Sequence, residues 1–546
     1  MGLLLQRFRP DGAEPVPLWP AAFPAFVWRE VLRDDRVTVT VRASGRHARL
    51  RAAEAGRVTD VASATVDGEW RYEISATEAT WYWVEGDVDD VTWGVDEDLS
   101  TPRVTAVVPT FRRPAEAVAQ TRALLAADVV ARVVVVDQGE GLGDVPAFAD
   151  LQSREPDRVV LLSQHNLGGS GGYARGMLES LRWPADAVFL SDDDAVIEPE
   201  SLRRMVVLQA LSAARGRPCV VGTGMRSAEQ PELLVALTER VEPRRFWWGP
   251  ADGLADPLDL AAATTPAEWH RLLPTRRADY AGWWGALLPP GAVTDIGLPA
   301  PYFLKWDDAE YGLRARRRGY DIRTLPGVAV RHPTWAAKGT AAGWHSYLMH
   351  RNRLATAAAY RCGRGVLLDS FVHQVKHVLS LQYATADLWN GAADAVLAGP
   401  DTWLGSDLRD ARATAEAILD RLPPPGTGSD DAVPRAWGRA VAAARAVAGL
   451  VLPGSTSPAW TTRVSAGELS WRDGLGADRV VVDAPGGAAV LERDPARARR
   501  LLRDTLVTHA RLALAWPRLT RRYAHALPPL LREDYWRRVL GLDSDG

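Results

Sequence analysis

The stretch between residues 102 and 191 constrains the fold most, because short apolar runs alternate there with segments of helical period. A strand that is apolar on both faces must be covered on both faces, which is typical of parallel strands joined by helices. We therefore predict a mostly parallel sheet with ligand chemistry at the carboxyl ends of its strands. The predicted strands are Val104–Val108, Arg132–Asp137, Arg158–Ser163 and Ala187–Ser191, with helices near 115–127 and 173–182.

Different patterns flank this region. Residues 1–98 hold short alternating segments such as Arg36–Val41, which predict an antiparallel β-sandwich or barrel. After about residue 346, Ala-, Leu- and Arg-rich segments predict helices. We expect three domains, at 1–98, 99–345 and 346–546, in agreement with roughly 100–200 residues per domain. The expected C-terminal helices are His350–Tyr360, Val366–His377, Leu408–Leu422, Val433–Ala448 and Ala496–Ala515.

Composition excludes several classes of protein. A formal net charge of −3 supplies no large positive field, so we expect no binding of nucleic acid by the protein as a whole. Two cysteines, Cys219 and Cys362, exclude a disulfide framework and favour a reducing, cytoplasmic compartment. The longest apolar stretch, Ala440–Leu452, is broken by Arg445 and is too short to cross a bilayer.

The C-terminal region is basic. Residues 491–538 contain 12 arginines and five acids beside Leu, Trp and Tyr. Such a surface can lie on anionic lipid, and it can equally be a solvated helical face.

The strongest chemical signal is Asp192-Asp193-Asp194, directly after the fourth predicted strand. Three adjacent carboxylates repel one another unless solvent or a cation surrounds them. Asp192 and Asp194 point the same way in an extended segment and can share one divalent ion. The alternative is an acidic loop that caps the helix expected at Glu198–Ala213, and the preceding apolar strand favours the metal site.

A glycine-rich segment, Asn166–Ala174, follows the third predicted strand. Residues 169–174 satisfy a loose G-x-G-x-x-A dinucleotide pattern, but the segment follows a third strand and the downstream acid belongs to a triple cluster. We favour a nucleotide-binding loop whose glycines let the backbone approach the ligand, over a merely flexible turn.

Further candidates follow later in the chain. Asp307, Asp308 and Glu310 begin a predicted helix, and adjacent carboxylates raise one another's proton affinity, which suits a general base. Trp283 and Trp284 lie among glycines and suggest a platform for sugar rings, and His332 at a strand end is a candidate third metal ligand. Aromatic residues of the first domain offer a sugar-binding face or, more readily, a core: Trp70, Tyr72, Trp81, Tyr82, Trp83 and Trp93.

Together these motifs resemble the family 2 inverting glycosyltransferases of GT-A fold. The match covers about 102–350 and is specific because the motifs occur in the family's order. Within that family the chain is similar to the actinobacterial galactofuranosyltransferases that polymerise cell-wall galactan. The motifs are Val107–Arg113, Val136–Gln138, Asn166–Gly172, Asp192–Asp194, Trp283-Trp284, Trp306–Glu310 and His332.

The resemblance implies a role for each matching residue. Asp192, Asp194 and His332 would bind Mn²⁺ or Mg²⁺, Asp308 would be the general base, and Asp307 would contact hydroxyl groups of the donor or acceptor. The implied donor-binding residues are Arg112, Gln138, Asn166, Asp193 and His350, with Arg113 as a further candidate. The implied acceptor- or sugar-binding residues are Trp283, Trp284, Trp306, Glu310 and Trp335.

The expected function is transfer of galactofuranose from UDP-galactofuranose to a polyprenyl-diphosphate-linked glycan. The resemblance implies that the protein works at the inner face of the plasma membrane, as a peripheral protein and a homo-oligomer. Two alternatives stay open: a rhamnosyl- or glucosyltransferase of the same fold, and a non-catalytic glycan-binding scaffold.

Overall fold

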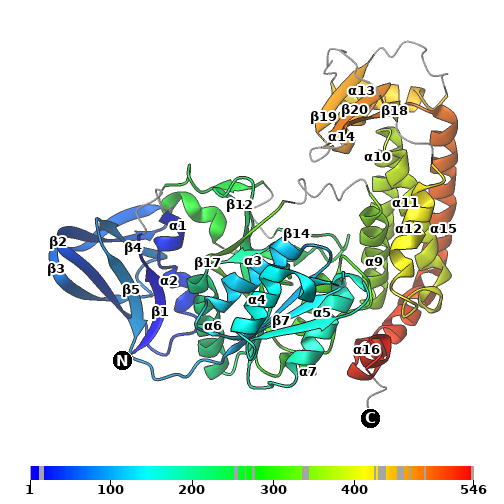
Figure 1. The fold of residues 1–546 in the computed structure, drawn as a ribbon. Helices are drawn as coiled ribbons and strands as arrows, with labels where there is room; N and C mark the ends of the chain where they lie inside the picture. The colour runs from blue at the N-terminus through cyan, green and yellow to red at the C-terminus, as the bar shows by residue number, and fades with distance from the viewer. Residues whose placement is uncertain are drawn as a thin grey trace.

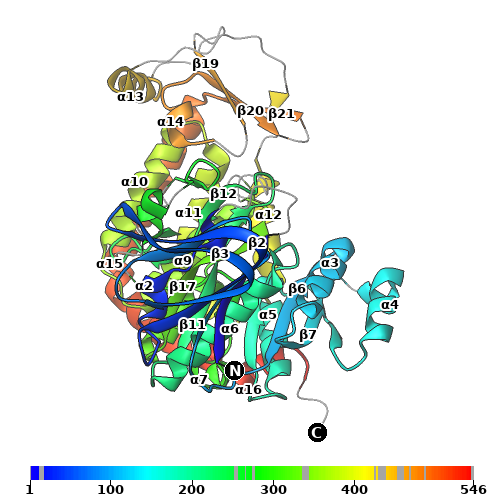
Figure 2. The ribbon, with the colours of Figure 1, turned by 90° about the vertical axis from the view of Figure 1, so that its left-hand side faces the viewer.

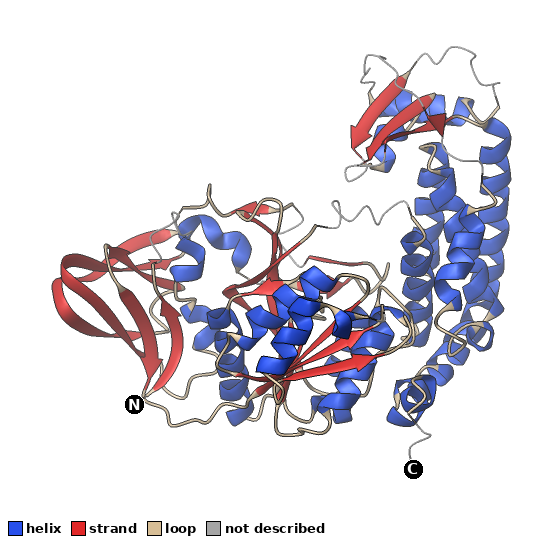
Figure 3. Cartoon of the chain, viewed as in Figure 1, coloured by secondary structure: helices blue, strands red, loops and turns tan. Residues whose placement is uncertain are grey.

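The computed structural model describes residues 2–542 except 11–17, 140, 251–255, 265, 274–276, 335–342, 423–425, 428–437, 452–459, 466–468 and 485–486. An antiparallel sheet lies at one end of the molecule, an α/β body lies in the centre, and long helices stand at the other end (Figure 1, Figure 3). The fold class expected from the sequence is therefore confirmed. The domain boundaries at residues 98 and 345 stay predictions.

The N-terminal sheet is built on one long hairpin. β2 (Arg36–Glu54) pairs with β3 (Arg57–Ser75), and its other edge pairs with β4 (Trp81–Gly86) and β5 (Asp90–Val95). β1 (Leu3–Phe8) adds to β5, which gives a single five-stranded antiparallel sheet. Buried and exposed residues alternate along β2, as the period of an extended strand requires.

Most aromatic side chains of this sheet are core residues. Trp81 packs edge to face against Trp269 of the α/β body, with ring centroids 5.3 Å apart. The idea of a sugar-binding face is therefore wrong for the four aromatic residues that are at most 2% exposed, which are Trp81, Tyr82, Trp83 and Trp93. Trp70 and Tyr72 are partly exposed, with ring centroids 6.1 Å apart.

The central sheet has ten strands and contains the four predicted ones. These run parallel in the order β8-β7-β6-β9. Beyond β9 the sheet becomes mixed, because β16 lies antiparallel between β9 and β11, and β17 lies parallel to β11. The strands are β6 (Val104–Thr110), β7 (Val130–Asp137), β8 (Val159–Ser163), β9 (Ala187–Leu190), β10 (Val196–Ile197), β11 (Cys219–Ser227), β12 (Leu233–Ala236), β15 (Leu258–Asp259), β16 (Ala286–Leu288) and β17 (Asp321–His332).

Helices cover both faces of this sheet, as its doubly apolar strands require. Val133 and Val135 of β7 belong to the core on the side of α3 (Pro114–Leu125) and α6 (Pro199–Ala214). Val134 and Val136, the alternate residues, pack on the side of α5 (Gly168–Ser180). The remaining helices of the body are α4 (Pro146–Arg154), α7 (Ala292–Ile296) and α8 (Asp307–Arg317).

The C-terminal part is mainly helical, as expected. α9, α11 and α15 pack on one another, and α10 packs on α15. α15 runs the length of the bundle (Figure 1) and is longer than predicted, because it continues through Pro517. The helices are α9 (His345–Ala359), α10 (Gly365–Leu379), α11 (Tyr383–Ala398), α12 (Asp410–Leu419), α13 (Arg439–Ala448), α15 (Pro495–Ala526) and α16 (Glu533–Val539).

A small sheet at one end of the bundle was not predicted. Its strands are β18 (Gly426–Thr427), β19 (Thr461–Ser465), β20 (Arg479–Ala484) and β21 (Gly487–Glu492). Figure 2 shows it standing beyond α10 and α15, away from the α/β body. The three consecutive valines of β20 are a strand signal that the surrounding helical composition concealed. Among the described residues, no helix is long and apolar enough to span a membrane.

Candidate active site

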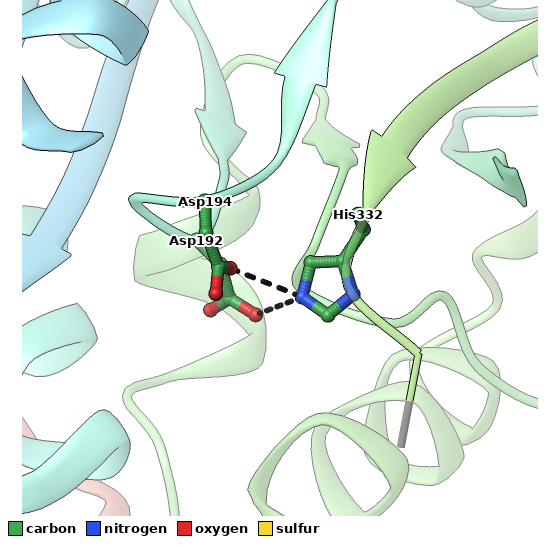
Figure 4. A group of neighbouring side chains, drawn as sticks. All are labelled: Asp192, Asp194 and His332. Carbon is green, nitrogen blue, oxygen red and sulfur yellow. Dashed lines mark ion pairs between the residues drawn. The ribbon is translucent and has the colours of Figure 1, made fainter. Parts of the chain in front are cut away.

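Two strand ends bring the predicted metal ligands together. Asp192 and Asp194 follow β9, and His332 is the last residue of β17 (Figure 4). His332 Nε2 lies 3.4 Å from Asp192 Oδ2 and 3.2 Å from Asp194 Oδ1, and one ligand atom from each residue lies within 4.8 Å of the others. Two carboxylates and one imidazole at these separations are donors that suit Mn²⁺ or Mg²⁺.

The middle carboxylate of the acidic run faces protein groups instead. Thr110 Oγ1 donates a hydrogen bond of 2.7 Å to Asp193 Oδ2, and Arg113 Nη1 lies 3.3 Å from Asp193 Oδ1. Arg113 also pairs with Asp194. Burial raises the pKa of Asp193 to about 6, although the bond from Thr110 opposes that rise. Asp193 and Arg113 thus tie the acidic loop to the end of β6.

A tyrosine links this group to the tryptophan pair. The Tyr173 hydroxyl lies 2.8 Å from Asp192 Oδ1 and 2.9 Å from the Trp283 carbonyl oxygen. The ring of Trp283 packs edge to face on Tyr173 at 4.7 Å. Sequence reasoning assigned Tyr173 no role, because its contact with Asp192 depends on how α5 lies against β9.

Asp307 and Asp308 begin α8, after a loop that holds three residues in the left-handed region. The φ angles are +71° for Phe303, +70° for Lys305 and +74° for Trp306. Ser170 Oγ donates to Asp307 Oδ2 at 3.1 Å, which joins the start of α5 to the start of α8. Asp308 is partly exposed, and its Oδ1 accepts a hydrogen bond from the backbone amide of the next residue, Ala309.

The surroundings of Asp308 favour its protonated form. Burial raises the pKa of Asp308, the adjacent charge of Asp307 raises it further, and Lys305 opposes both. Glu239 adds to the rise; it is 3% exposed and accepts a 2.8 Å bond from the Tyr280 hydroxyl. A carboxylate with a raised pKa is suited to take a proton from a hydroxyl group.

The glycine-rich segment contacts protein at the points where its glycines are needed. Gly168 has φ +69°, and a Cβ there would lie 2.0 Å from the Phe303 carbonyl oxygen. A Cβ at Gly176 would lie 2.1 Å from Val107. These glycines let the start of α5 approach the loop before α8 and the sheet. The approach of this segment's backbone to a nucleotide stays a prediction.

Three of the predicted donor-binding residues, Arg112, Gln138 and Asn166, follow β6, β7 and β8. Gln138 Nε2 donates to the Gly168 carbonyl at 3.0 Å, and its Oε1 accepts from the Leu167 amide at 2.9 Å. Asn166 Oδ1 accepts from the Gly168 amide at 2.9 Å. Arg112 is exposed, with φ +56°. Gln138 and Asn166 therefore shape the glycine-rich segment, and their contact with a donor stays a prediction.

The chain is similar to known transferases over nearly its whole length. Residues 102–355 match the family described as "Glycosyltransferase like family 2". Galactofuranosyltransferase GlfT2 of Mycolicibacterium smegmatis is 33% identical over 95% of this chain and 87% of its own. The chain belongs to glycosyltransferase family 2. GlfT2 of Mycobacterium tuberculosis is 36% identical to this chain, over 55% of this chain and 49% of its own length. Galactofuranosyltransferase GlfT1 of M. tuberculosis is 30% identical, over 43% of this chain and 71% of its own length.

The tryptophan pair of this glycosyltransferase is buried. Trp283 is 5% exposed and Trp284 is 8% exposed, and each belongs to an apolar cluster beside the central sheet. Both indoles therefore contribute to the core. Trp284 still lies 6.4 Å from the His332 ring, and the roles of both indoles toward a sugar stay predictions.

Two further residues expected at a sugar site have structural partners. Trp306 is 1% exposed and stacks on Phe246 with centroids 5.7 Å apart. Glu310 pairs with Arg314 at 2.8 Å and accepts a 3.0 Å bond from the Tyr360 hydroxyl. These partners give the buried Glu310 carboxylate a structural role, and its contact with the acceptor stays a prediction. Trp335 lies outside the described residues.

His350 lies inside the helical bundle. It is 1% exposed, and its Nε2 is 2.9 Å from Ser370 Oγ. Its ring stacks on Trp389 at 3.8 Å. The helical phase of α9 turns this residue toward α10 and α11, and its contact with the pyrophosphate stays a prediction.

Proposed function

We propose that the enzyme transfers galactofuranose from UDP-galactofuranose to a sugar hydroxyl by one displacement with inversion. The full-length similarity to GlfT2 carries this proposal, because it extends through the flanking parts as well as the family 2 region. The aspartates at 192, 194, 307 and 308 are all present, so a non-catalytic scaffold is not favoured.

Asp308 is the proposed general base. In the reaction, the acceptor oxygen forms a bond to the anomeric carbon while the bond from that carbon to the UDP oxygen breaks. The proton of the acceptor hydroxyl passes to the Asp308 carboxylate. Asp307, held by Ser170, is proposed to bind a hydroxyl group of the donor or acceptor. Arg112, Gln138 and Asn166 are proposed to hold the nucleotide.

The proposed metal ligands are Asp192, Asp194 and His332. Their donor atoms fit Mn²⁺ or Mg²⁺, and the imidazole favours Mn²⁺. A bound ion would neutralise charge on the UDP leaving group. Tyr173 supports the site by fixing the Asp192 carboxylate.

We further propose that the acceptor is a polyprenyl-diphosphate-linked galactan. The enzyme would then act as a peripheral protein at the inner face of the membrane, and we propose that it is a homo-oligomer. The similarity to GlfT2 and the basic C-terminal region support this location.

The direct test incubates the purified enzyme with UDP-galactofuranose, Mn²⁺ and a synthetic lipid-linked galactofuranosyl acceptor. Mass spectrometry should detect added hexose units, and UDP release should exceed the control without acceptor. Parallel assays with dTDP-rhamnose and UDP-glucose decide the sugar. Equal or faster transfer from either donor would overturn the galactofuranose assignment.

A variant tests the base. Asp308→Asn should abolish transfer while UDP binding with Mn²⁺, measured by calorimetry, stays unchanged. Retained turnover would remove Asp308 from the role of base.

A further inference from the structure

The loop before the proposed catalytic carboxylates has an unfavourable backbone conformation. Phe303, Lys305 and Trp306 all have φ near +70°, which L-residues with side chains rarely adopt. Such a conformation persists only where the surrounding structure holds it, and it is often found at functional sites. The loop leads directly into Asp307 and Asp308 at the start of α8. Whatever holds the loop therefore also sets the positions of both carboxylates.

On one side the loop is held by the start of α5. The Ser170 amide donates to the Phe303 carbonyl at 3.2 Å, and Gly168 leaves the space that this carbonyl needs. These contacts come from within the α/β body. They fix the carbonyl oxygen of Phe303, whereas the carbonyl oxygens of the neighbouring loop residues are held from the other side.

On the other side the loop is held by α9 of the helical part. Asn352, 0% exposed, places its Nδ2 2.9 Å from the Leu304 carbonyl oxygen, 3.0 Å from that of Lys305 and 3.3 Å from that of Tyr302. Carbonyl groups that lose water without gaining a partner are costly, and the two N–H groups of one carboxamide lie within hydrogen-bond distance of three carbonyl oxygens.

The orientation of that carboxamide is itself fixed. Arg351 Nε donates to Asn352 Oδ1 at 3.0 Å, which turns the NH₂ group toward the loop. Arg351 Nη2 also lies 3.3 Å from the Tyr302 carbonyl, and its guanidinium stacks on Trp403 at 4.0 Å. Arg353, the residue after Asn352, donates hydrogen bonds to the carbonyl oxygens of Arg245 and Phe246. The Phe246 ring in turn stacks on Trp306. Consecutive residues of α9 thus hold the backbone around the site.

We propose that Asn352 is a positioning residue, whose carboxamide holds the Phe303–Trp306 loop so that Asp308 meets the acceptor hydroxyl. The proposal deepens the proposed function and depends on Asp308 as base. It explains why a catalytic centre built on an α/β sheet is joined to a helical bundle: one donor group of that bundle reaches the loop. The resemblance of the 102–350 motifs gave Asn352 no role.

The test compares Asn352 with a matched residue. Asn390 is also a buried asparagine of the bundle, and its Oδ1 accepts bonds from Gln374 and Thr505 on neighbouring helices. Asn352→Ala and Asn390→Ala should both lower the melting temperature. Asn352→Ala alone should lower kcat about 100-fold, since small displacements of a catalytic group have effects of that order. UDP binding with Mn²⁺ should be unchanged in both.

The pH profile separates positioning from general weakening. Asp307, Glu239 and Lys305 face Asp308, and burial is the largest cause of its raised pKa. A loosened loop admits water, so the acid limb of kcat against pH should move to lower pH in Asn352→Ala and stay in place in Asn390→Ala. Equal kcat per folded molecule in the two variants, or an unmoved limb in Asn352→Ala, would overturn the proposal.

Two further variants keep the outcome decisive. If Asn352→Ala does not fold, Asn352→Ser is measured, because its one donor hydrogen should leave kcat about 10-fold low; an unchanged kcat there overturns the proposal. Asp308→Asn is assayed in parallel. If it retains turnover, the base assignment fails, and the proposal that Asn352 positions that base fails with it. If it abolishes turnover while Asn352→Ala has full kcat, only the positioning proposal fails.

Discussion

Acidic residues of one short run have different surroundings in this enzyme. The pKa of Asp308 is raised by burial and by the adjacent charge of Asp307. Glu310, two residues further along α8, forms a buried ion pair with Arg314. The composition of the run indicated a functional site, but it did not separate a base from a structural ion pair, since Arg314 lies one turn after Glu310 on α8 itself and the difference depends on which face of that helix is buried.

Removal of Glu310 tests its structural role. Glu310→Gln leaves the Arg314 guanidinium buried without its carboxylate, so the free energy of unfolding should fall by about 3–5 kcal/mol. Chemical denaturation measures this value. The control is Glu179→Gln, which breaks the more exposed pair with Arg182 and should cost less than about 1 kcal/mol. If the free energy of unfolding fell equally in the two variants, burial of the Glu310–Arg314 pair would not increase its contribution to stability.

The raised pKa of Asp308 predicts the pH dependence of transfer. A general base must be deprotonated, so a raised pKa means that kcat/KM increases with pH through a range above the ordinary carboxyl pKa of 3.8. In Asp307→Asn the neighbouring negative charge is absent, so the pKa of Asp308 should fall and the limb should move to lower pH. Initial rates across a pH series measure the limb, and a shift to higher pH would contradict this account.

Elements with strong periodicity could be predicted, and contacts between distant elements could not. The doubly apolar strands β6 to β9 predicted the parallel sheet and placed Asp192 and Asp194 at its edge. The left-handed residues Phe303, Lys305 and Trp306 escaped prediction, because none is glycine. The contact of Asn352 with this loop also escaped it, since a lone asparagine in a helix carries no pattern. The burial of His350 in the bundle could not be predicted either, because motif order does not determine the phase of α9.

Histidines inside the bundle predict its acid sensitivity. Burial lowers the pKa values of His350, His377 and His509, that of His377 to about 4. These groups are neutral when folded and accept protons on unfolding, so stability is fully present above the unfolded pKa of 6.5 and is lost as pH falls from there toward 4. Thermal melts between pH 7.5 and 4.5 should show a falling midpoint.

A substitution checks the source of that sensitivity. His377→Gln should flatten the dependence of the melting temperature on pH below 6.5, because one acceptor of protons is gone from the unfolded chain. His47→Gln, on the N-terminal sheet, is the control and should leave the slope as it is. If the dependence of the melting temperature on pH were unaltered in His377→Gln, the loss of stability in acid would come from other groups.

At the scale of the whole molecule, the N-terminal sheet and the α/β body share one apolar core, which contains Leu5 and Val39 of the sheet and Val104 and Met205 of the body. Glu200 of α6 adds polar contacts at this junction: it accepts a 2.7 Å bond from the Arg7 amide and pairs with Arg203 and Arg204. Those arginines in turn donate to carbonyls of the N-terminal segment, at Leu4, Leu5, Arg7 and Pro20. The sheet and the body should therefore unfold together.

Glu200→Ala should weaken this junction. It leaves Arg204, 3% exposed, without a carboxylate, so the free energy of unfolding should fall by about 3–5 kcal/mol. Because the sheet and the body share an apolar core, calorimetry should show one transition at a lower temperature. Glu198→Ala, an exposed acid at the start of α6, should shift stability by less than about 1 kcal/mol and keep the transition single. Because the proposed active-site residues follow β9 or lie on β17 and α8, transfer by Glu200→Ala below its melting transition should match the unaltered enzyme; a loss of kcat there would mean that the N-terminal sheet acts on the site itself.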